Sequence, residues 1–225
     1  MKYLMKEMEC NFKIVEQFHV YHPTLIHVVK YTRHEELKKD ICDDLLNYAD
    51  KQKHLTNVKA TMTEWNITSP EIEILKKSII DDLKNFPLSL DWGPCGEFDV
   101  ANIWGNVYRN GEETILHSHQ PEDLTMVYFL KCEEGDAPLI FDGSDEIVFP
   151  EEGVMAIFPG YIKHGVPKHT SENIRITLAA DINRVGERFL SSRKGIPSSV
   201  EHTPKVHVNT RGSTPTNSRE YDHHY

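Results

Sequence analysis

The sequence lacks any long apolar run. A membrane-spanning helix needs about 18 or more consecutive apolar residues, and no stretch of the 225 residues approaches that length. The N-terminal segment, residues 1–9, carries charges where the apolar part of a signal peptide would lie. We therefore expect no membrane association and a soluble protein of the cytoplasm.

Cysteine is scarce, and the four that occur lie far apart in the chain. They are Cys10, Cys42, Cys95 and Cys132. No two of them form a C-x-x-C pair, so the sequence suggests neither a zinc knuckle nor a disulfide framework. Reduced cysteines in a cytoplasmic protein fit this spacing best.

Basic residues are also in deficit, with 25 Lys and Arg against 35 Asp and Glu and a net charge of −10. Nonspecific binding of nucleic acid depends on neutralising phosphates with lysine and arginine, so we do not expect it. A hydrophobic content of 39% over 225 residues is enough for one domain with a sizeable core.

The N-terminal part, residues 1–98, predicts one strand and two helices. The β-branched segment Leu25–Tyr31 is typical of a strand. A T-x-x-E capping box and apolar residues at helical spacing predict a first helix over about 32–51. Ser69, followed by proline, is a good N-cap for a second helix over about 70–85. We expect both helices to support a sheet from outside, within the same domain.

From residue 99 onward, short segments rich in β-branched and aromatic residues alternate with turn clusters. This pattern predicts a β-sandwich or barrel. We expect eight strands, and eight strands of this kind form a double-stranded β-helix, or jelly roll. The fold class is thus mainly β with N-terminal helices, and residues 99–183 form the core. The expected strands lie near residues 99–109, 113–119, 124–131, 138–142, 145–149, 153–158, 163–167 and 173–182.

The last part of the chain, residues 184–225, has a different composition. Residues 195–225 are rich in serine, threonine, proline, asparagine and histidine and have too few apolar groups to offset the entropy of ordering. We expect either a flexible extension or a segment that docks on another subunit of a homo-oligomer. His223 and His224 are read as part of this solvated tail.

The strongest chemical signal is a set of three histidines. His117 and His119 are two positions apart, so in an extended strand they project from the same face, about 6–7 Å apart along the backbone. His164 begins a later apolar run, far enough along the chain for a sheet to turn and return beside the first strand. Three neutral imidazoles can hold one metal and leave other coordination positions open. An H-x-H pair alone is weak evidence, but its surroundings strengthen it.

Those surroundings resemble a known family. The chain contains Y-x-x-G-x-x-x-x-x-H-x-H from Tyr108, an apolar strand over 124–130, F-P-x-x-x-x-H from Phe158, and R-x-T from Arg175. This order resembles the Fe(II)- and 2-oxoglutarate-dependent dioxygenases, in their prolyl-hydroxylase-like branch. More narrowly, it is similar to uncharacterised 2-oxoglutarate and iron(II) oxygenases of marine bacteria and their phages. The resemblance covers residues 60–183 well and the N-terminal third loosely.

One position departs from the family pattern. Most members have a carboxylate two residues after the first histidine, where this chain has His119. Either the site is a three-histidine variant, or a nearby acid, Glu122 or Asp123, serves as the anionic ligand. We favour the three histidines, because the two acids follow Pro121 and have the character of turn residues.

The resemblance also implies roles for other side chains. Fe(II) would bind His117, His119 and His164, and 2-oxoglutarate would be the cosubstrate, with release of succinate and CO2 as a substrate is hydroxylated. Arg175 would hold the distal carboxylate of 2-oxoglutarate, since its planar fork suits a bidentate contact. The other cosubstrate-binding residues implied are Thr177, Tyr128, Tyr108 and Asn106.

Two alternatives from other classes stay open. A cupin-like metal enzyme that does not use 2-oxoglutarate would need the three histidines but not Arg175. A non-catalytic jelly-roll module for binding or structure would need neither. The substrate itself, whether a small molecule or a protein side chain, is not encoded in any motif of the sequence.

Overall fold

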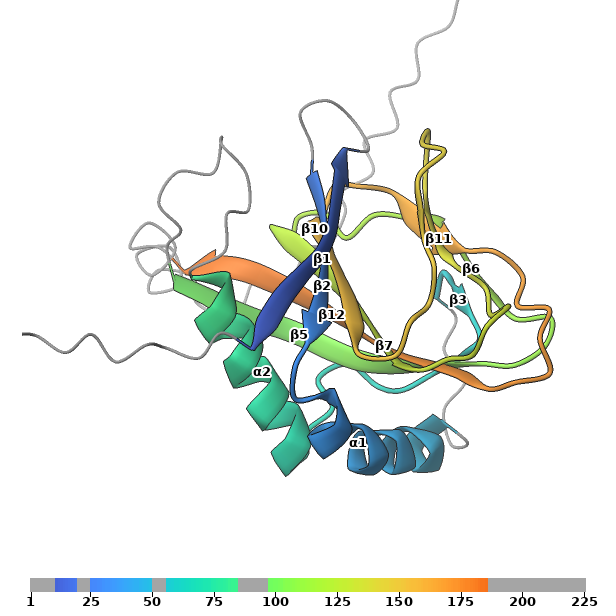
Figure 1. Ribbon diagram of the computed structural model, residues 1–225, viewed down its shortest axis with the longest axis horizontal. Helices are drawn as coiled ribbons and strands as arrows, with labels where there is room; N and C mark the ends of the chain where they lie inside the picture. The colour runs from blue at the N-terminus through green and yellow to red at the C-terminus, as the bar shows by residue number, and fades with distance from the viewer. Residues whose placement is uncertain (1–10, 20–24, 50–55, 85–96, 186–225) are drawn as a thin grey trace, which may run out of the picture.

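The computed structural model describes residues 11–19, 25–49, 56–84 and 97–185, and in these residues two antiparallel sheets pack face to face (Figure 1). The larger sheet runs in the order β1 (Phe12–His19), β2 (Leu25–Tyr31), β10 (Val154–Pro159), β7 (Leu124–Lys131), β12 (Arg175–Val185), β5 (Glu97–Tyr108) and β4 (Thr61–Met62). The smaller sheet runs in the order β3 (Val58–Lys59), β6 (Glu113–His117), β11 (His164–Val166), β8 (Leu139–Phe141) and β9 (Ile147–Val148).

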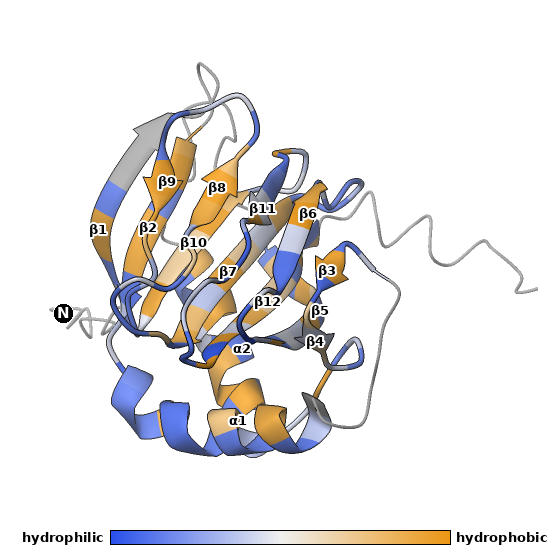
Figure 2. Ribbon diagram, turned by 90° about the vertical axis from the view of Figure 1, so that its right-hand side faces the viewer, coloured by the Kyte–Doolittle hydropathy of each residue, from blue (hydrophilic) through white to orange (hydrophobic). Residues whose placement is uncertain are grey.

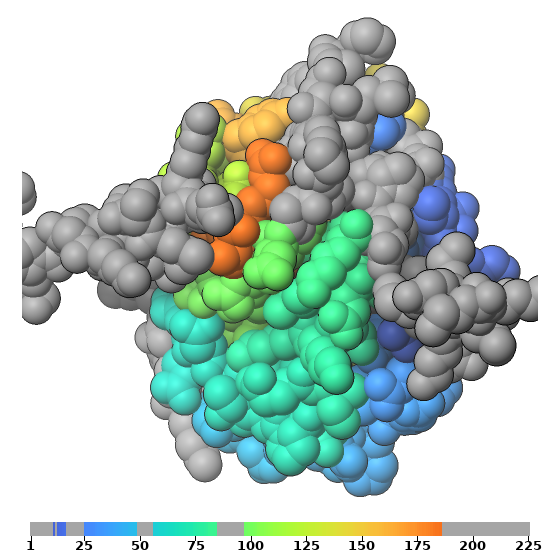
Figure 3. All heavy atoms as spheres, turned by 90° about the vertical axis from the view of Figure 1, so that its left-hand side faces the viewer, coloured from blue at the N-terminus to red at the C-terminus, as the bar shows by residue number. Residues whose placement is uncertain are grey.

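Two helices, α1 (His34–Ala49) and α2 (Pro70–Leu83), cover the outer face of the larger sheet (Figures 1 and 3). The start of α2 is fixed by Ser69, whose hydroxyl accepts a hydrogen bond from the Ile72 N–H at 3.2 Å. The visible side of α1 is mostly hydrophilic, whereas strands β2, β8 and β10 are mostly hydrophobic (Figure 2). The helices therefore act as an amphipathic layer between the sheet and water.

Alternation along the central strands separates two apolar cores. Tyr128 on β7 and Leu178 on β12 belong to the core beneath the helices. Val127 and Phe129 point the other way, into the core between the sheets. Such two-sided burial explains why β7 is a continuous apolar run rather than an alternating pattern.

Helix α1 packs against the larger sheet at Gly105 on β5. A Cβ atom at this position would overlap the side chain of Leu45, which is fully buried. Glycine at this point of the strand thus lets the helix backbone lie close to the sheet.

The predicted fold class is confirmed, and so are all eight strands of the core, in order and approximate bounds. The strand Leu25–Tyr31 and both N-terminal helices are confirmed as well. Strands β1, β3 and β4 were not predicted. The last two contain only two residues each and are formed by pairing with β6 and β5, which local sequence does not reveal.

The division of the chain into residues 1–98, 99–183 and 184–225 stays a prediction. Strand β12 continues to Val185, and the rest of the predicted tail lies outside the described residues. Cys42 and Cys132 are free and buried, while Cys10 and Cys95 lie outside the described part. Among the described helices, none is long and apolar enough to cross a membrane.

The burial of Leu45 generates a test of the helix layer. Replacing Leu45 with Asp places a charge in an apolar contact, so we expect the free energy of unfolding to fall by at least about 3 kcal/mol. Asn47→Asp on the exposed side of the same helix is the matched control, and we expect a change within about 0.5 kcal/mol. Chemical denaturation of both variants measures the difference, and equal stabilities would contradict the packing of α1 on the sheet.

Candidate functional site

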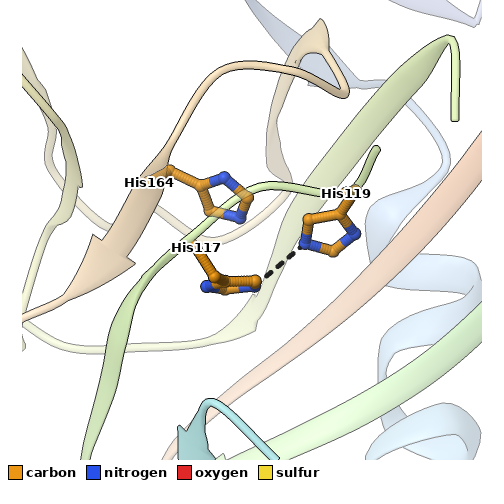
Figure 4. Close-up of side chains that lie close together, drawn as sticks. All are labelled: His117, His119 and His164. Carbon is orange, nitrogen blue, oxygen red and sulfur yellow. Dashed lines mark hydrogen bonds between the residues drawn. The ribbon is translucent and has the colours of Figure 1, made fainter. Parts of the chain in front are cut away.

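The three predicted histidines lie close together at the end of β6 and the start of β11. His117 ends β6 and pairs directly with His164, which begins β11, and His119 follows in the turn after β6 (Figure 4). One ligand atom from each ring lies within 4.8 Å of the others. The side chains point toward one another, with Nε2 of His117 and Nε2 of His119 only 3.0 Å apart.

Each ring is oriented through its other nitrogen. Nδ1 of His117 lies 2.8 Å from the carbonyl oxygen of Ile115, and Nδ1 of His164 lies 3.1 Å from that of Ile162. Nδ1 of His119 lies 2.6 Å from Oδ1 of Asp181. Because all three Nδ1 atoms face an acceptor, each neutral ring carries its proton there and leaves Nε2 for a ligand.

Burial favours the neutral form of two of these rings. It lowers the pKa of His164 well below the ordinary value, and the neighbouring imidazoles of His117 and His119 lower it further. Burial also lowers the pKa of His117, against the opposing effect of its hydrogen bond to Ile115. Metal binding requires neutral imidazole, so the group fits a transition metal such as iron or zinc.

The turn after β6 places His119. The N–H of His119 donates to the carbonyl oxygen of Gly160 at 2.7 Å, and the N–H of Gly160 donates to that of Asp123 at 3.0 Å. A Cβ atom at Gly160 would overlap the backbone of Glu122. The turn is thus clamped against the end of β10, and this contact requires glycine.

The two acids considered as alternative ligands lie elsewhere. Oε2 of Glu122 accepts a hydrogen bond from the side chain of Asn183. Oδ2 of Asp123 accepts one from the N–H of Arg184 at 2.8 Å. Both carboxylates are therefore directed toward the end of β12, and the close group consists of the three histidines.

A narrow inner cavity extends from the histidines into the space between the sheets, and Arg175 lies in its wall. The guanidinium is fully buried, 4.7 Å from the ring centre of Tyr108 and 5.3 Å from that of Phe129. Within the described residues, none of its three nitrogens makes a hydrogen bond of acceptable geometry, and the Tyr108 hydroxyl is engaged with Oγ1 of Thr114 at 2.7 Å. Burial lowers the pKa of Arg175, and the nearby Tyr108 opposes this effect.

Three more of the predicted residues share this cavity with Arg175. They are Tyr108, Asn106 and Thr177. Strand pairing explains the grouping, because Arg175 lies opposite Tyr108 and Thr177 opposite Asn106 in the β12–β5 register. Oδ1 of Asn106 is buried and has no hydrogen-bond partner within the described residues.

Tyr128 requires a correction, because the structure does not bring it to the cavity. Its side chain lies in the core beneath the helices, where its hydroxyl is 2.6 Å from Nδ1 of His34. The neighbouring Val127 lines the cavity instead. Successive side chains on β7 point to opposite faces, so the tyrosine cannot share the face of Val127.

Two further residues contact His119, and sequence reasoning missed one of them, Asp181. Asp181 accepts at Nδ1, and Trp104 stacks on the ring with centres 5.6 Å apart and planes 14° apart. A signal for Asp181 was present, because it continues the period-two face that begins with Arg175 and Thr177.

An outer cleft of about 610 Å³ adjoins His117 and His119. It shares Trp104, His117 and His119 with the inner cavity, and Trp65 packs edge-on against Trp104 at its rim. Trp65 is 48% exposed. A molecule bound in this cleft would therefore have access to the histidine group from solvent.

Comparison with known proteins is informative only at the level of structure. No family model and no curated protein sequence match the chain. A Pseudomonas putida prolyl-4-hydroxylase superposes with a TM-score of 0.54 at 15% identity, over 67% of this chain and 88% of the other. A Trichoplax adhaerens prolyl hydroxylase, solved with a hypoxia inducible factor peptide, gives 0.55 at 13% identity, over 74% and 86%.

The chain shares its fold with these two prolyl hydroxylases. The resemblance seen in the motifs is therefore confirmed for the fold, including its jelly-roll core. Identity of this order says nothing about substrate. The narrower similarity to oxygenases of marine bacteria and phages stays a prediction.

The converging histidines generate a test of the metal centre. We expect the protein to bind one Fe(II) per chain, and His117→Ala or His164→Ala to weaken binding by more than about 100-fold, since even residues behind the ligands contribute 10–100-fold. Anaerobic titration with a competing chelator measures the affinity. Asp123→Ala is the control and should bind iron like the parent; iron binding that depended on Asp123 and not on His119 would contradict the three-histidine assignment.

Proposed function

We propose that this protein is an Fe(II)- and 2-oxoglutarate-dependent oxygenase that hydroxylates an as yet unidentified substrate and releases succinate and CO2. The observation that carries this proposal is Arg175, a fully buried guanidinium without a hydrogen-bonded partner in the described residues, in the same cavity as the three histidines. In this proposal residues 99–183 are the catalytic core, supported by residues 1–98.

A buried, unpaired arginine is costly for a fold, because removing an ion from water takes several kcal/mol unless a partner restores the interaction. Stacking between Tyr108 and Phe129 offsets only part of that cost. A carboxylate is the natural partner, since its two oxygens match the guanidinium fork. The distal carboxylate of 2-oxoglutarate would fill this role, with the Thr177 hydroxyl and the Asn106 side chain beside it.

The other end of the cavity supplies the metal ligands. His117, His119 and His164 would hold Fe(II), which together with 2-oxoglutarate and O2 provides the oxidising power. The protein's own contribution is orientation and dryness: Arg175 fixes one end of the cosubstrate, and apolar residues such as Val127 and Leu139 keep water out of the cavity between the ends.

The substrate would enter from the outer cleft, opposite the cosubstrate. Trp65 and Trp104 form one wall of that cleft beside His119. This arrangement keeps the reacting C–H bond and the cosubstrate on different sides of the histidine group. At 15% and 13% identity, the two similar prolyl hydroxylases do not indicate which substrate this protein would bind.

A second candidate is a cupin-like metal enzyme that does not use 2-oxoglutarate. The replacement of the usual carboxylate by His119 favours it, because three histidines without a carboxylate also suit other metal chemistry. Arg175 argues against it, since that reading assigns no ligand to the buried guanidinium. Succinate formation from 2-oxoglutarate in the presence of iron separates the two candidates.

Arg175→Met provides the direct test. The substitution removes both charge and fork, and loss of one partner from a buried pair costs about 3–5 kcal/mol, or roughly two to four decades of affinity for 2-oxoglutarate. Arg175→Lys should fall between parent and methionine variant, because it keeps charge without the bidentate geometry. Anaerobic titration of the iron-loaded protein, followed by the metal-to-ligand charge-transfer band, measures all three affinities.

The control is Arg184→Met on the same strand, whose guanidinium lies by Asp123 outside the cavity. Iron binding should be unchanged in every variant. A parent that shows no band at millimolar 2-oxoglutarate, or an Arg175→Met variant that titrates like the parent, would reject the oxygenase in favour of the second candidate.

A further inference from the structure

The three histidines differ in what holds them. The rings of His117 and His164 donate to backbone carbonyl oxygens, of Ile115 and Ile162 respectively. The ring of His119 alone among the three faces a carboxylate, that of Asp181. His119 is also the residue that occupies the place where the similar family has an acidic ligand.

We propose that Asp181 is a positioning residue that returns to the metal centre the negative charge lost when histidine replaces the acidic ligand. The inference rests on the metal-binding part of the proposed function and does not depend on 2-oxoglutarate. Asp181 does not touch the metal in this proposal. It acts through His119, by fixing the Nδ1–H and making Nε2 a stronger electron donor.

The surroundings of Asp181 suit this role. Its side chain is 7% exposed, and its second oxygen, Oδ2, accepts a hydrogen bond from Nδ2 of Asn102 at 3.1 Å. The amide oxygen of Asn102 in turn accepts from Nδ2 of Asn66 at 3.2 Å. Both carboxylate oxygens are thus engaged, and the carboxylate is held toward His119 rather than toward solvent.

His119 is constrained in two directions. The contact with Asp181 fixes the edge of the ring at 2.6 Å, and Trp104 stacks against its face. Rotation about the ring's bond to the chain would break both contacts. The ring therefore presents Nε2 toward His117 and His164 before any ion arrives, which lowers the entropic cost of binding.

The charge of the proposed metal centre also supports this role for Asp181. A divalent ion on three neutral imidazoles keeps its full positive charge. Glu122 and Asp123 are directed to Asn183 and Arg184. Among the described residues, Asp181 is the carboxylate in hydrogen-bond contact with the histidine group, so it is the one placed to offset this charge.

The test separates charge from orientation. Asp181→Asn keeps an oxygen that can accept from His119 but removes the charge, whereas Asp181→Ala removes both. We expect the first to weaken metal binding by about 10-fold and the second by up to about 100-fold, the range for partners behind a metal ligand. The probe is Co²⁺, titrated against a chelator and followed by its ligand-field absorption, and Asp123→Asn is the control.

A second background distinguishes this role from mere support of the fold. In the His119→Asp variant the acidic ligand is restored directly, and Asp181 then faces a like charge. Adding Asp181→Asn to that variant should raise the affinity for Co²⁺ or leave it unchanged, in contrast to the loss expected in the parent. A structural role would lower affinity by the same factor in both backgrounds.

The outcomes test the inference about Asp181 separately from the proposed oxygenase function. Loss of Co²⁺ affinity in the parent background without any loss in the His119→Asp background supports the inference. The inference is overturned if the parent and Asp181→Asn bind Co²⁺ with equal affinity, or if Asp181→Asn lowers the affinity equally in both backgrounds. In either case, normal binding of 2-oxoglutarate to the parent and to Asp181→Asn would leave the proposed function intact. Conversely, a parent whose affinity for Co²⁺ depends on Asp181 and His119 but which never binds 2-oxoglutarate retains the inference and loses the proposed function.

Discussion

The alternation of side chains along β12 is the constraint on which both the packing and the site depend. This strand lies between β7 and β5 in the larger sheet. Ile176 and Leu178 belong to the core beneath the helices, whereas Arg175 and Thr177 face the cavity. A slip of one residue would exchange the two sets. Burial of the apolar face therefore fixes the register that also places the polar groups.

That same face carries opposite charges at its two ends. Arg175 begins β12, and Asp181 lies six residues further on. At roughly 3.3 Å per residue, their backbones are about 20 Å apart, too far for an ion pair. Neither charge neutralises the other. Each is left to act on a different group, the guanidinium on a ligand in the cavity and the carboxylate on the ring of His119.

The sequence was sufficient to predict the core strands and most residues of the candidate site. The predictions that failed did so for physical reasons. Period two and the turn residues located the strands, and the same period placed Arg175 with Thr177. The two-residue alternation did not reveal which way Tyr128 points. Strand β7 is buried on both faces, and its composition does not show which face meets the cavity. The two-residue strands β3 and β4 form by pairing with β6 and β5, which their own sequence does not indicate. Asp181 was overlooked because it lies beyond the R-x-T motif, although it continues the same face.

The histidine group and Arg175 carry different weight in choosing a function. Three converging imidazoles are compatible with many metal enzymes, so they indicate a kind of site rather than a reaction. The buried guanidinium is more selective, since it demands an anion at a fixed place along the cavity. A ligand that satisfies both must bind metal at one end and carry a carboxylate at the other. A short dicarboxylate with a metal-binding keto acid at one end would meet both conditions, whereas a neutral ligand would leave the arginine unpaired.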